Sequence, residues 1–230
     1  MATRASLLDV YDRLLRSLGP QHWWPADSPF EVMVGAILTQ SASWTNVEKA
    51  IRNLKDAGAL SPEALRRLRQ DKLAQTIYSV GYYSSKARKI KALADYLGSR
   101  FDDDLDAMTD VDRATLRAEL LGVHGIGEET ADSILLYAVG TPSFVIDAYT
   151  RRVFLRLGLG PESGGYGDYR RLFEDNLEAE PHMFGEYHAL IVRHGKYVCR
   201  KQPLCRDCCL LDVCPTGRDN LRRPDGGAQG

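Results

Sequence analysis

The stretch GVHGIGEETADS, residues Gly122 to Ser133, places a Gly-x-Gly turn between two runs with helical periodicity. Glycine lets the backbone adopt positive φ and approach another surface closely. The N–H groups of the turn, together with the positive end of the helix that starts near Glu128, suit one phosphate. Such a hairpin can hold a DNA backbone without reading its sequence. A tight helical hairpin with a glycine cap is the alternative for so short a motif.

Helical patterns dominate the rest of the chain. The segment SPEALRRLRQ begins with Ser61 as a predicted N-cap and Pro62 at the first helical position. A later run is predicted to open at Ser84 or Ser85 and to close at Gly98. No segment shows the sustained alternation of a strand, so we predict an all-α protein with roughly ten short helices.

Composition sets the broad class. The chain has 230 residues, of which 44% are hydrophobic and 27% charged, as in ordinary soluble domains. Its net charge of −1 does not by itself indicate a nucleic-acid partner. The N-terminus resembles an amphipathic helix rather than a signal peptide, and no apolar run has membrane-spanning length. We therefore expect a soluble protein of the cytoplasm with no membrane partner. We also expect a monomer, located in the bacterial cytosol or nucleoid.

The cysteines form one cluster near the C-terminus. All five lie in the segment CRKQPLCRDCCLLDVC, at Cys199, Cys205, Cys208, Cys209 and Cys214. The odd count and the expected cytosolic location argue against disulfides. Zinc ribbons usually bring two Cys-x2-Cys pairs, whereas this segment has one, and short sequential Cys runs favour an iron–sulfur cluster. Cys208 is the preferred third ligand, with Cys209 as the alternative.

Asp147 stands between an apolar run and a helical run in SFVIDAYTRRVFLRLG. The simplest interpretation is an N-cap aspartate. A capping carboxylate is rigidly held and can also face a cleft, so the structural and the catalytic interpretation are compatible.

These motifs in this order resemble the endonuclease III family of DNA glycosylases, from about Trp23 to Cys214. The resemblance implies a six-helix barrel domain with the helix-hairpin-helix at residues 24–140. It implies a second domain, from residues 1–23 and 141–214, that holds a [4Fe–4S] cluster through Cys199, Cys205, Cys208 and Cys214. Double-stranded DNA would lie across a cleft between the domains, with a damaged base flipped out. Residues 215–230 are predicted to be a flexible tail.

The resemblance assigns roles to individual positions. Gly125 and Gly127 match the hairpin glycines, and Asp147 matches the catalytic aspartate. Gln40, in AILTQ, matches the glutamine that helps fill the gap left by the flipped base. Tyr82 stands where the family often has a leucine wedge, and an aromatic ring can also intercalate.

The stretch after the hairpin departs from the family pattern. Bifunctional members carry a lysine before Thr-Ala, whose amine attacks the sugar and forms a Schiff base. This chain has Glu129 before Thr130 and Ala131. A carboxylate cannot form an imine, so the remaining route is attack by water, assisted by Asp147. We therefore predict a monofunctional glycosylase in which Glu129 polarises the water, recognises the base or serves only the helix N-terminus.

Tryptophans suggest the substrate. Trp23, Trp24 and Trp44 are predicted near the base pocket, although core packing explains each of them equally well. The combination resembles the endonuclease III-like 3-methyladenine DNA glycosylases. An N-alkylated purine is cationic and is attracted by aromatic faces. Lys196 is a further candidate for this pocket, and a phosphate contact or a solvated side chain is its simpler interpretation.

Two other functions compete with this one. The first is a bifunctional oxidised-pyrimidine glycosylase and abasic-site lyase that uses another lysine, such as Lys196 or Lys86. The second is a DNA-damage-binding paralogue with little or no activity, which the loss of the lysine at Glu129 would allow. The presence of Asp147 argues against the second.

Overall fold

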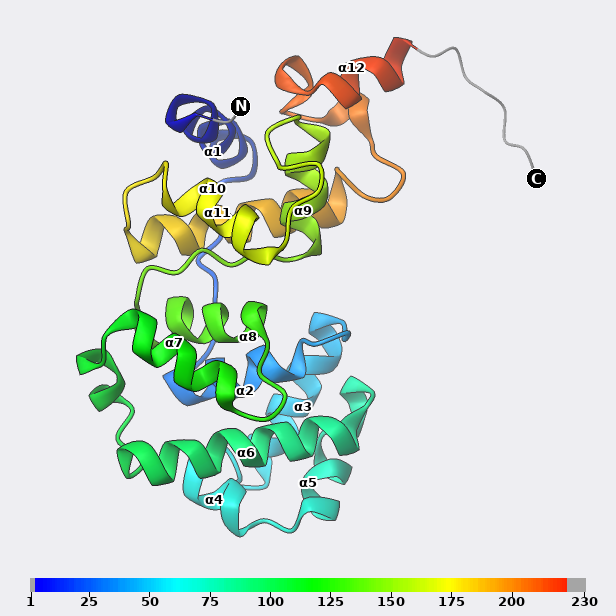
Figure 1. Ribbon diagram of the computed structural model, residues 1–230. Coiled ribbons are helices and arrows are strands. Elements are labelled where there is room, and N and C mark those ends of the chain that lie inside the picture. The colour runs from blue at the N-terminus through cyan, green and yellow to red at the C-terminus, as the bar shows by residue number, and fades with distance from the viewer. Residues whose placement is uncertain (1–2, 223–230) are drawn as a thin grey trace. The chain divides into compact units, whose positions relative to one another are not determined.

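The computed structural model describes residues 3–222, which form twelve α-helices and no β-strand (Figure 1). The all-α prediction is confirmed. The helices divide into two compact units, one of Trp24–Ser143 and one that joins the chain up to Trp23 with the chain from Phe144 onward. None of the helices in this described part is long and apolar enough to cross a membrane.

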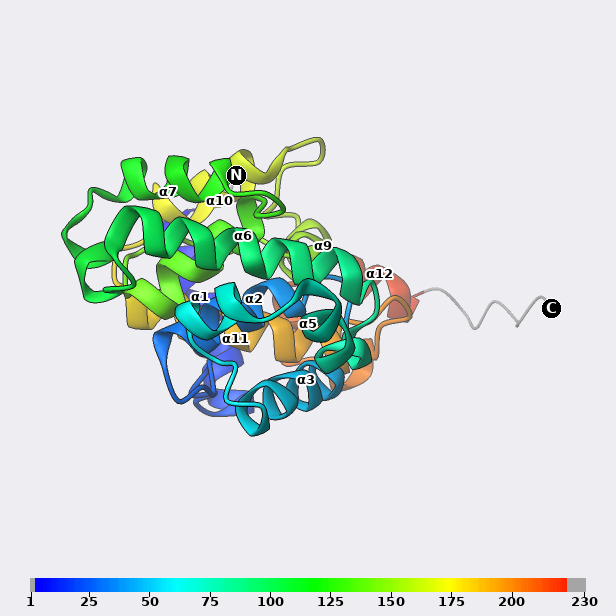
Figure 2. The same ribbon diagram turned by 90° about the horizontal axis from the view of Figure 1, so that it is seen from below.

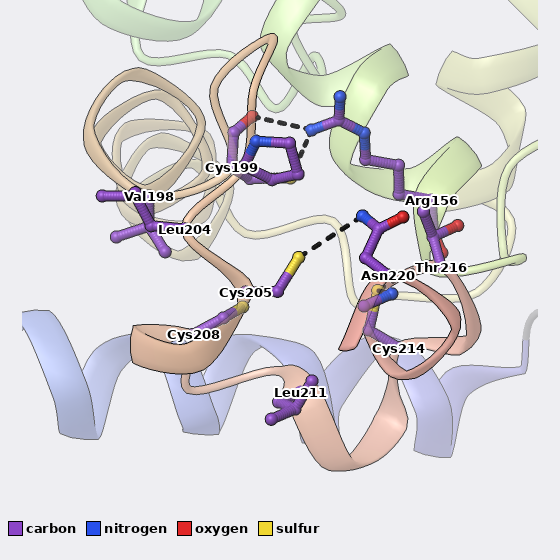
Figure 3. Close-up of a pocket in the computed structure, with 12 residues that line it drawn as sticks. Arg156, Val198, Cys199, Leu204, Cys205, Cys208, Leu211, Cys214, Thr216 and Asn220 are labelled. Carbon is purple, nitrogen blue, oxygen red and sulfur yellow. Dashed lines mark hydrogen bonds between the residues drawn. The ribbon is translucent and has the colours of Figure 1, made fainter. Parts of the chain in front are cut away.

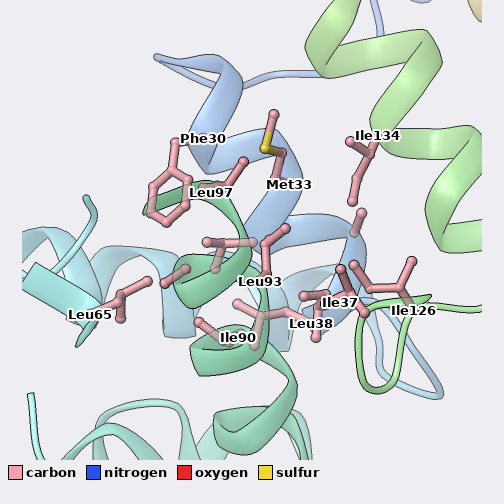
Figure 4. Packing of buried hydrophobic residues seen from close by; sticks show 14 of the residues in the cluster. Phe30, Met33, Ile37, Leu38, Leu65, Ile90, Leu93, Leu97, Ile126 and Ile134 are labelled. Carbon is pink, nitrogen blue, oxygen red and sulfur yellow. The ribbon is translucent and has the colours of Figure 1, made fainter. Parts of the chain in front are cut away.

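The unit of Trp24–Ser143 is built around one buried helix. Its helices are α2 (Pro29–Leu38), α3 (Trp44–Asp56), α4 (Pro62–Arg67), α5 (Gln70–Thr76), α6 (Tyr83–Phe101), α7 (Arg113–Gly122) and α8 (Glu128–Ser133). Every residue of α2 after Pro29 is buried, as expected for a helix that is apolar on all sides. Met33 and Ile37 of α2 pack among Leu93 of α6 and Ile134 (Figure 4). The helix α5 packs against α6 (Figure 2).

A local signal explains where α4 begins, whereas a long-range contact explains why α6 does not end at Gly98. Ser61 caps α4 with Pro62 at its first position, as predicted. The prediction for α6 is wrong at both ends, because the helix begins at Tyr83 and continues past Gly98 to Phe101. A Cβ at Gly98 would lie 2.6 Å from Nη1 of Arg66. Gly98 therefore gives room to a packed guanidinium and does not end the helix.

The other unit has an aromatic core. It contains α1 (Arg4–Leu18), α9 (Ala148–Arg156), α10 (Tyr166–Glu174), α11 (Pro181–Tyr197) and α12 (Pro215–Arg222). Phe144 and Phe173 stack with ring centroids 3.8 Å apart. The buried hydroxyl of Tyr187 donates to the carbonyl oxygen of Leu7 at 2.7 Å, which joins α11 to α1. This contact brings the start of the chain into one unit with its last third.

The helix α12 corrects the predicted tail. Residues Pro215–Arg222 are helical, whereas the sequence suggested flexibility from residue 215. Pro215 stands at the first helical position, and the N–H of Gly217 donates to Sγ of Cys214 at 3.3 Å. These local contacts anchor the helix to the cysteine segment. Residues 223–230 of the predicted tail lie outside the described residues.

Candidate functional site

The two glycines of the hairpin between α7 and α8 have different surroundings. Gly125 has φ of +84°, and a Cβ there would lie 2.2 Å from Cγ of Lys89. Gly127 is the N-cap of α8 in extended backbone, and a Cβ there would meet no atom within 4 Å. Gly125 is therefore required by the fold, whereas the surface at Gly127 remains open to a ligand.

Gln40 is held against this hairpin. Its Nε2 donates to the carbonyl oxygen of Gly125 at 3.2 Å and to Oγ1 of Thr130 at 3.0 Å. Its Oε1 accepts from Nζ of Lys89 at 2.5 Å. The structure thus brings two predicted DNA-binding residues together and adds Lys89. Nothing in the local sequence marks Lys89, since its partners lie 49 and 36 positions away along the chain.

Tyr82 projects from the loop before α6. Its side chain is 78% exposed, and its φ is +44°, directly after Gly81 with φ of +65°. A bulky residue in the left-handed region is uncommon, and such strain often occurs in functional loops. The geometry presents an aromatic ring to solvent, as a wedge residue requires.

Asp147 caps α9, as predicted. Its Oδ1 accepts from the backbone N–H of Thr150 at 2.7 Å and from Oγ1 of Thr150 at 2.9 Å. Its Oδ2 lies 3.8 Å from Nε2 of His188 on α11. Burial lowers the pKa of His188, and the nearby Asp147 opposes this shift only in part. The imidazole is therefore neutral at pH 7 and does not cancel the charge of the carboxylate.

Glu129 lies in the first turn of α8. Its side chain is exposed, whereas the next residue, Thr130, is buried. A carboxylate in this position interacts favourably with the positive end of the helix. Glu129 belongs to the unit of Trp24–Ser143 and Asp147 belongs to the other unit.

Two of the three predicted tryptophans meet in one aromatic cluster, formed by Trp24, Trp44 and Tyr137. The ring centroid of Trp24 lies 5.5 Å from that of Trp44 and 5.6 Å from that of Tyr137. Gly35 allows the indole of Trp24 to pack against α2, because a Cβ at Gly35 would come within 3.0 Å of the indole. All three rings are partly exposed. Tyr137 was missed because its run, SILLYAVG, reads only as an apolar helix.

Trp23 and Lys196, the other two residues predicted near the base pocket, belong to the other unit. Trp23 is half-buried. Lys196 is an exposed residue of α11, with its Nζ 5.1 Å from the ring centroid of Tyr197. That contact favours the interpretation of Lys196 as a solvated side chain.

Lys86 is the most buried lysine among the described residues. It is 2% exposed, and its Nζ donates to the carbonyl oxygens of Leu38 and Val80, each at 2.9 Å. Burial, with a smaller contribution from Lys89, lowers its pKa to about 8. The amine joins the end of α2 to the turn before α6. This bonding supports a structural role for Lys86.

Four of the five cysteines line one small cavity, drawn in Figure 3. They are Cys199, Cys205, Cys208 and Cys214. Cys209 is not among the lining residues, and its thiol bonds to Ser17 of α1. Across residues 3–222, no three Cys, His, Asp or Glu side chains converge closely enough to hold a single metal ion.

The chemistry of these thiols fits a metal cluster. Burial raises the pKa of Cys208 to about 12 and also raises the pKa of Cys214. Such thiols are neutral at pH 7 unless a metal holds them as thiolates. The lining also includes the apolar side chains of Leu204 and Leu211. Four cysteine sulfurs that line one cavity provide the ligands that an iron–sulfur cluster requires.

The hairpin suits an enzyme that holds a DNA backbone, and the capped aspartate suits one that cleaves an N-glycosidic bond. These features define the class of helix-hairpin-helix DNA glycosylases. The family model for the HhH-GPD superfamily of base excision DNA repair proteins matches residues 34–179, and the chain belongs to this family. Its enzyme class is that of the DNA N-glycosylases.

Two relatives show the same family. The chain is 46% identical over 206 residues to a protein of Methanocaldococcus jannaschii whose name proposes a DNA repair glycosylase, covering 89% of this chain and 94% of the relative. It is 30% identical to endonuclease III of Sulfolobus acidocaldarius, covering 84% of each chain. The predicted resemblance to the endonuclease III family is confirmed.

Solved structures share the fold. An endonuclease III–DNA complex matches with a TM-score of 0.83 at 24% identity, covering 97% of this chain and all of that chain. The 3-methyladenine DNA glycosylase MagIII of H. pylori, bound to 1,N6-ethenoadenine, matches with a TM-score of 0.71 at 26% identity. That match covers 85% of this chain and 98% of the glycosylase.

Proposed function

We propose that this enzyme removes cationic alkylated purines, such as 3-methyladenine, from double-stranded DNA by hydrolysis and does not cleave the strand. One observation carries the proposal: an exposed carboxylate, Glu129, occupies the first turn of the hairpin helix, where the bifunctional pattern has an amine. The position of Lys86 supports the proposal further, because its amine is buried between two carbonyl oxygens. A mechanism in which the Lys86 amine forms an imine would require both of these hydrogen bonds to break.

The aromatic cluster supports the choice of substrate. Trp24, Trp44 and Tyr137 present partly exposed rings within one unit. A cationic base gains attraction from such rings that a neutral base does not. The N-glycosidic bond of an alkylated purine is already weakened, so little acid assistance to the leaving base is needed. The likeness in fold to a 3-methyladenine DNA glycosylase agrees with this choice.

In this proposal Asp147 acts through its charge. One oxygen is fixed by Thr150, which sets the orientation of the carboxylate, and the other remains for the reaction. As the base leaves, positive charge develops on the sugar, and a fixed carboxylate stabilises that charge or activates the attacking water. The neutral His188 beside Asp147 leaves this negative charge uncompensated.

Release of bases from duplexes that each carry one defined lesion tests the proposal directly. We expect release of 3-methyladenine and related alkylpurines, with the strand intact until alkali is added. Release of oxidised pyrimidines with strand cleavage would instead identify a bifunctional enzyme. Binding to damaged duplex without release of any base would identify a damage-binding paralogue.

For the cofactor we propose a [4Fe–4S] cluster held by Cys199, Cys205, Cys208 and Cys214. When bound, the cluster would cross-link the C-terminal segment and give the protein a broad absorption at about 400 nm. The support is the shared cavity of the four thiols and the exclusion of Cys209 from it. Stoichiometric zinc in a colourless, folded protein would contradict this assignment.

Cysteine variants test the ligand set. Cys205→Ser removes a proposed ligand, and we expect loss of most of the visible absorption and a fall in stability of roughly 2 kcal/mol or more. Cys209→Ser changes a thiol that lies outside the cavity lining and forms a hydrogen bond with Ser17. This variant should retain the cluster. The measurements are iron content, absorption and thermal unfolding. Equal losses in both variants would show that the ligand register is wrong.

Gly127→Val tests the proposed phosphate contact. A Cβ at this position would meet no atom within 4 Å, so the variant should fold, while its side chain would block access of a phosphate to the hairpin N–H groups. We expect affinity for damaged and undamaged duplex to fall equally, by roughly tenfold or more. Gly165→Val, at the glycine N-cap of α10, is the matched control. A loss of damage selectivity at unchanged overall affinity would contradict a phosphate role.

A further inference from the structure

Each of the four cysteine sulfurs around the cavity has an N–H donor of its own. The pairs are Nη1 of Arg156 with Cys199 at 3.3 Å, Nδ2 of Asn220 with Cys205 at 3.5 Å, Nε2 of His194 with Cys208 at 3.6 Å, and the backbone N of Gly217 with Cys214 at 3.3 Å. The donors come from α9, α11 and α12. Two of them belong to α12, the helix that replaces the predicted tail.

We infer that these four donors form an electrostatic shell that sets the reduction potential of the cluster, and that α12 is part of the cluster site. The inference rests on the proposed [4Fe–4S] cofactor. Hydrogen bonds to cluster sulfurs are a known determinant of potential. An N–H group stabilises the more negative, reduced cluster more than the oxidised one. Each donor therefore raises the potential and protects the cluster from oxidation.

Two of the four donors, Arg156 and Gly217, are held in place by the fold. Besides Cys199, the guanidinium of Arg156 donates to the carbonyl oxygens of Arg200 and Lys201, which fixes its position on the loop. At Gly217, a Cβ would come within 3.2 Å of Leu211 and 3.4 Å of the sulfur of Cys214. A glycine at this point allows the backbone N–H to approach the sulfur closely.

His194 has no better partner than the sulfur. The residue is 1% exposed, and its Nδ1 has no hydrogen-bond partner among the described residues. A neutral imidazole carries one N–H, and a thiolate can only accept a hydrogen bond. The proton therefore belongs on Nε2, which faces Cys208. With the proton on Nδ1, a buried donor would be unsatisfied and two acceptors would face each other.

Asn220→Leu provides the cleanest test, because Asn220 is exposed and leucine has a similar size without a donor. The midpoint potential of the cluster-containing full chain is measured by spectroelectrochemical titration. We expect a shift to lower potential and faster loss of visible absorption in ferricyanide. His194→Phe should shift the potential in the same direction. Leu221→Asn, an exposed neutral exchange on the same helix, is the control and should leave the potential unchanged.

The possible results distinguish a failure of the proposed role of the four donors from a failure of the proposed cofactor. An unchanged potential in both Asn220→Leu and His194→Phe, at full iron content, would overturn the inference. Faster loss of the cluster at an unchanged potential would also overturn it, since α12 would then act only as a physical cover. Wild-type protein without iron would instead overturn the proposed cofactor.

Discussion

Asp147→Asn is expected to abolish base release while the protein still folds and binds DNA. Asparagine is as good an N-cap as aspartate, so its side-chain oxygen can keep both contacts with Thr150. The shape of the site is retained and only the negative charge is lost. Because that charge is proposed to stabilise a cationic transition state, single-turnover release should fall by roughly 100-fold or more.

The design of this experiment depends on comparing two variants. Asp147→Ala removes the charge and the cap together, so it should lower stability by about 1 kcal/mol in addition to abolishing release. Thermal unfolding and the affinity for damaged duplex are measured for both. Release by Asp147→Asn within a few-fold of wild type would mean that the carboxylate serves α9 alone and that another group carries the chemistry.

Short-range rules made part of the site predictable. Ser61 and Asp147 were recognised as N-caps because an N-cap depends on residues two or three positions away. Gly125 could be assigned for the same reason, since a turn between two helices needs a residue with positive φ. In each of these cases the signal, a cap or a turn, can be read from a few neighbouring residues.

Residues whose role comes from distant contacts could not be predicted in this way. Gly98 was interpreted as a helix end, whereas its role is set by Arg66, 32 positions earlier. Lys89 and Tyr137 gain their neighbours only when separate helices pack together. The donors of α12 were missed because a short polar helix is stabilised here by contacts with the cysteine segment rather than by its own sequence.

Electrostatics in the site also depended on the fold. No pattern in the sequence connects His188 with Asp147, which lies 41 positions earlier. Burial on α11 keeps its ring neutral and places it 3.8 Å from the carboxylate. The charge available to the reaction is therefore a property of the packing of α9 and α11, which no local pattern encodes.

Glu129→Lys is expected to change the reaction that the enzyme can perform. The wild-type protein should release the base, leave the strand intact and form no borohydride-trapped adduct with abasic DNA. In the variant an amine stands at an exposed position in the first turn of α8. We expect weak imine trapping on abasic DNA. Release of cationic alkylpurines should fall by roughly tenfold or more, because like charges repel.

Two neighbouring variants separate the amine from the loss of charge. Glu129→Gln removes the carboxylate without adding a nucleophile, so any trapping must come from the lysine of the first variant. Glu128→Lys places an amine in the same helical turn, with a similar loss of favourable interaction with the helix dipole. We expect no imine trapping on abasic DNA by this variant. If wild-type protein already cleaves abasic strands and traps efficiently, a lysine elsewhere is the nucleophile. The exposed Lys196 would then be the first to replace, because the buried amine of Lys86 is held by two carbonyl oxygens.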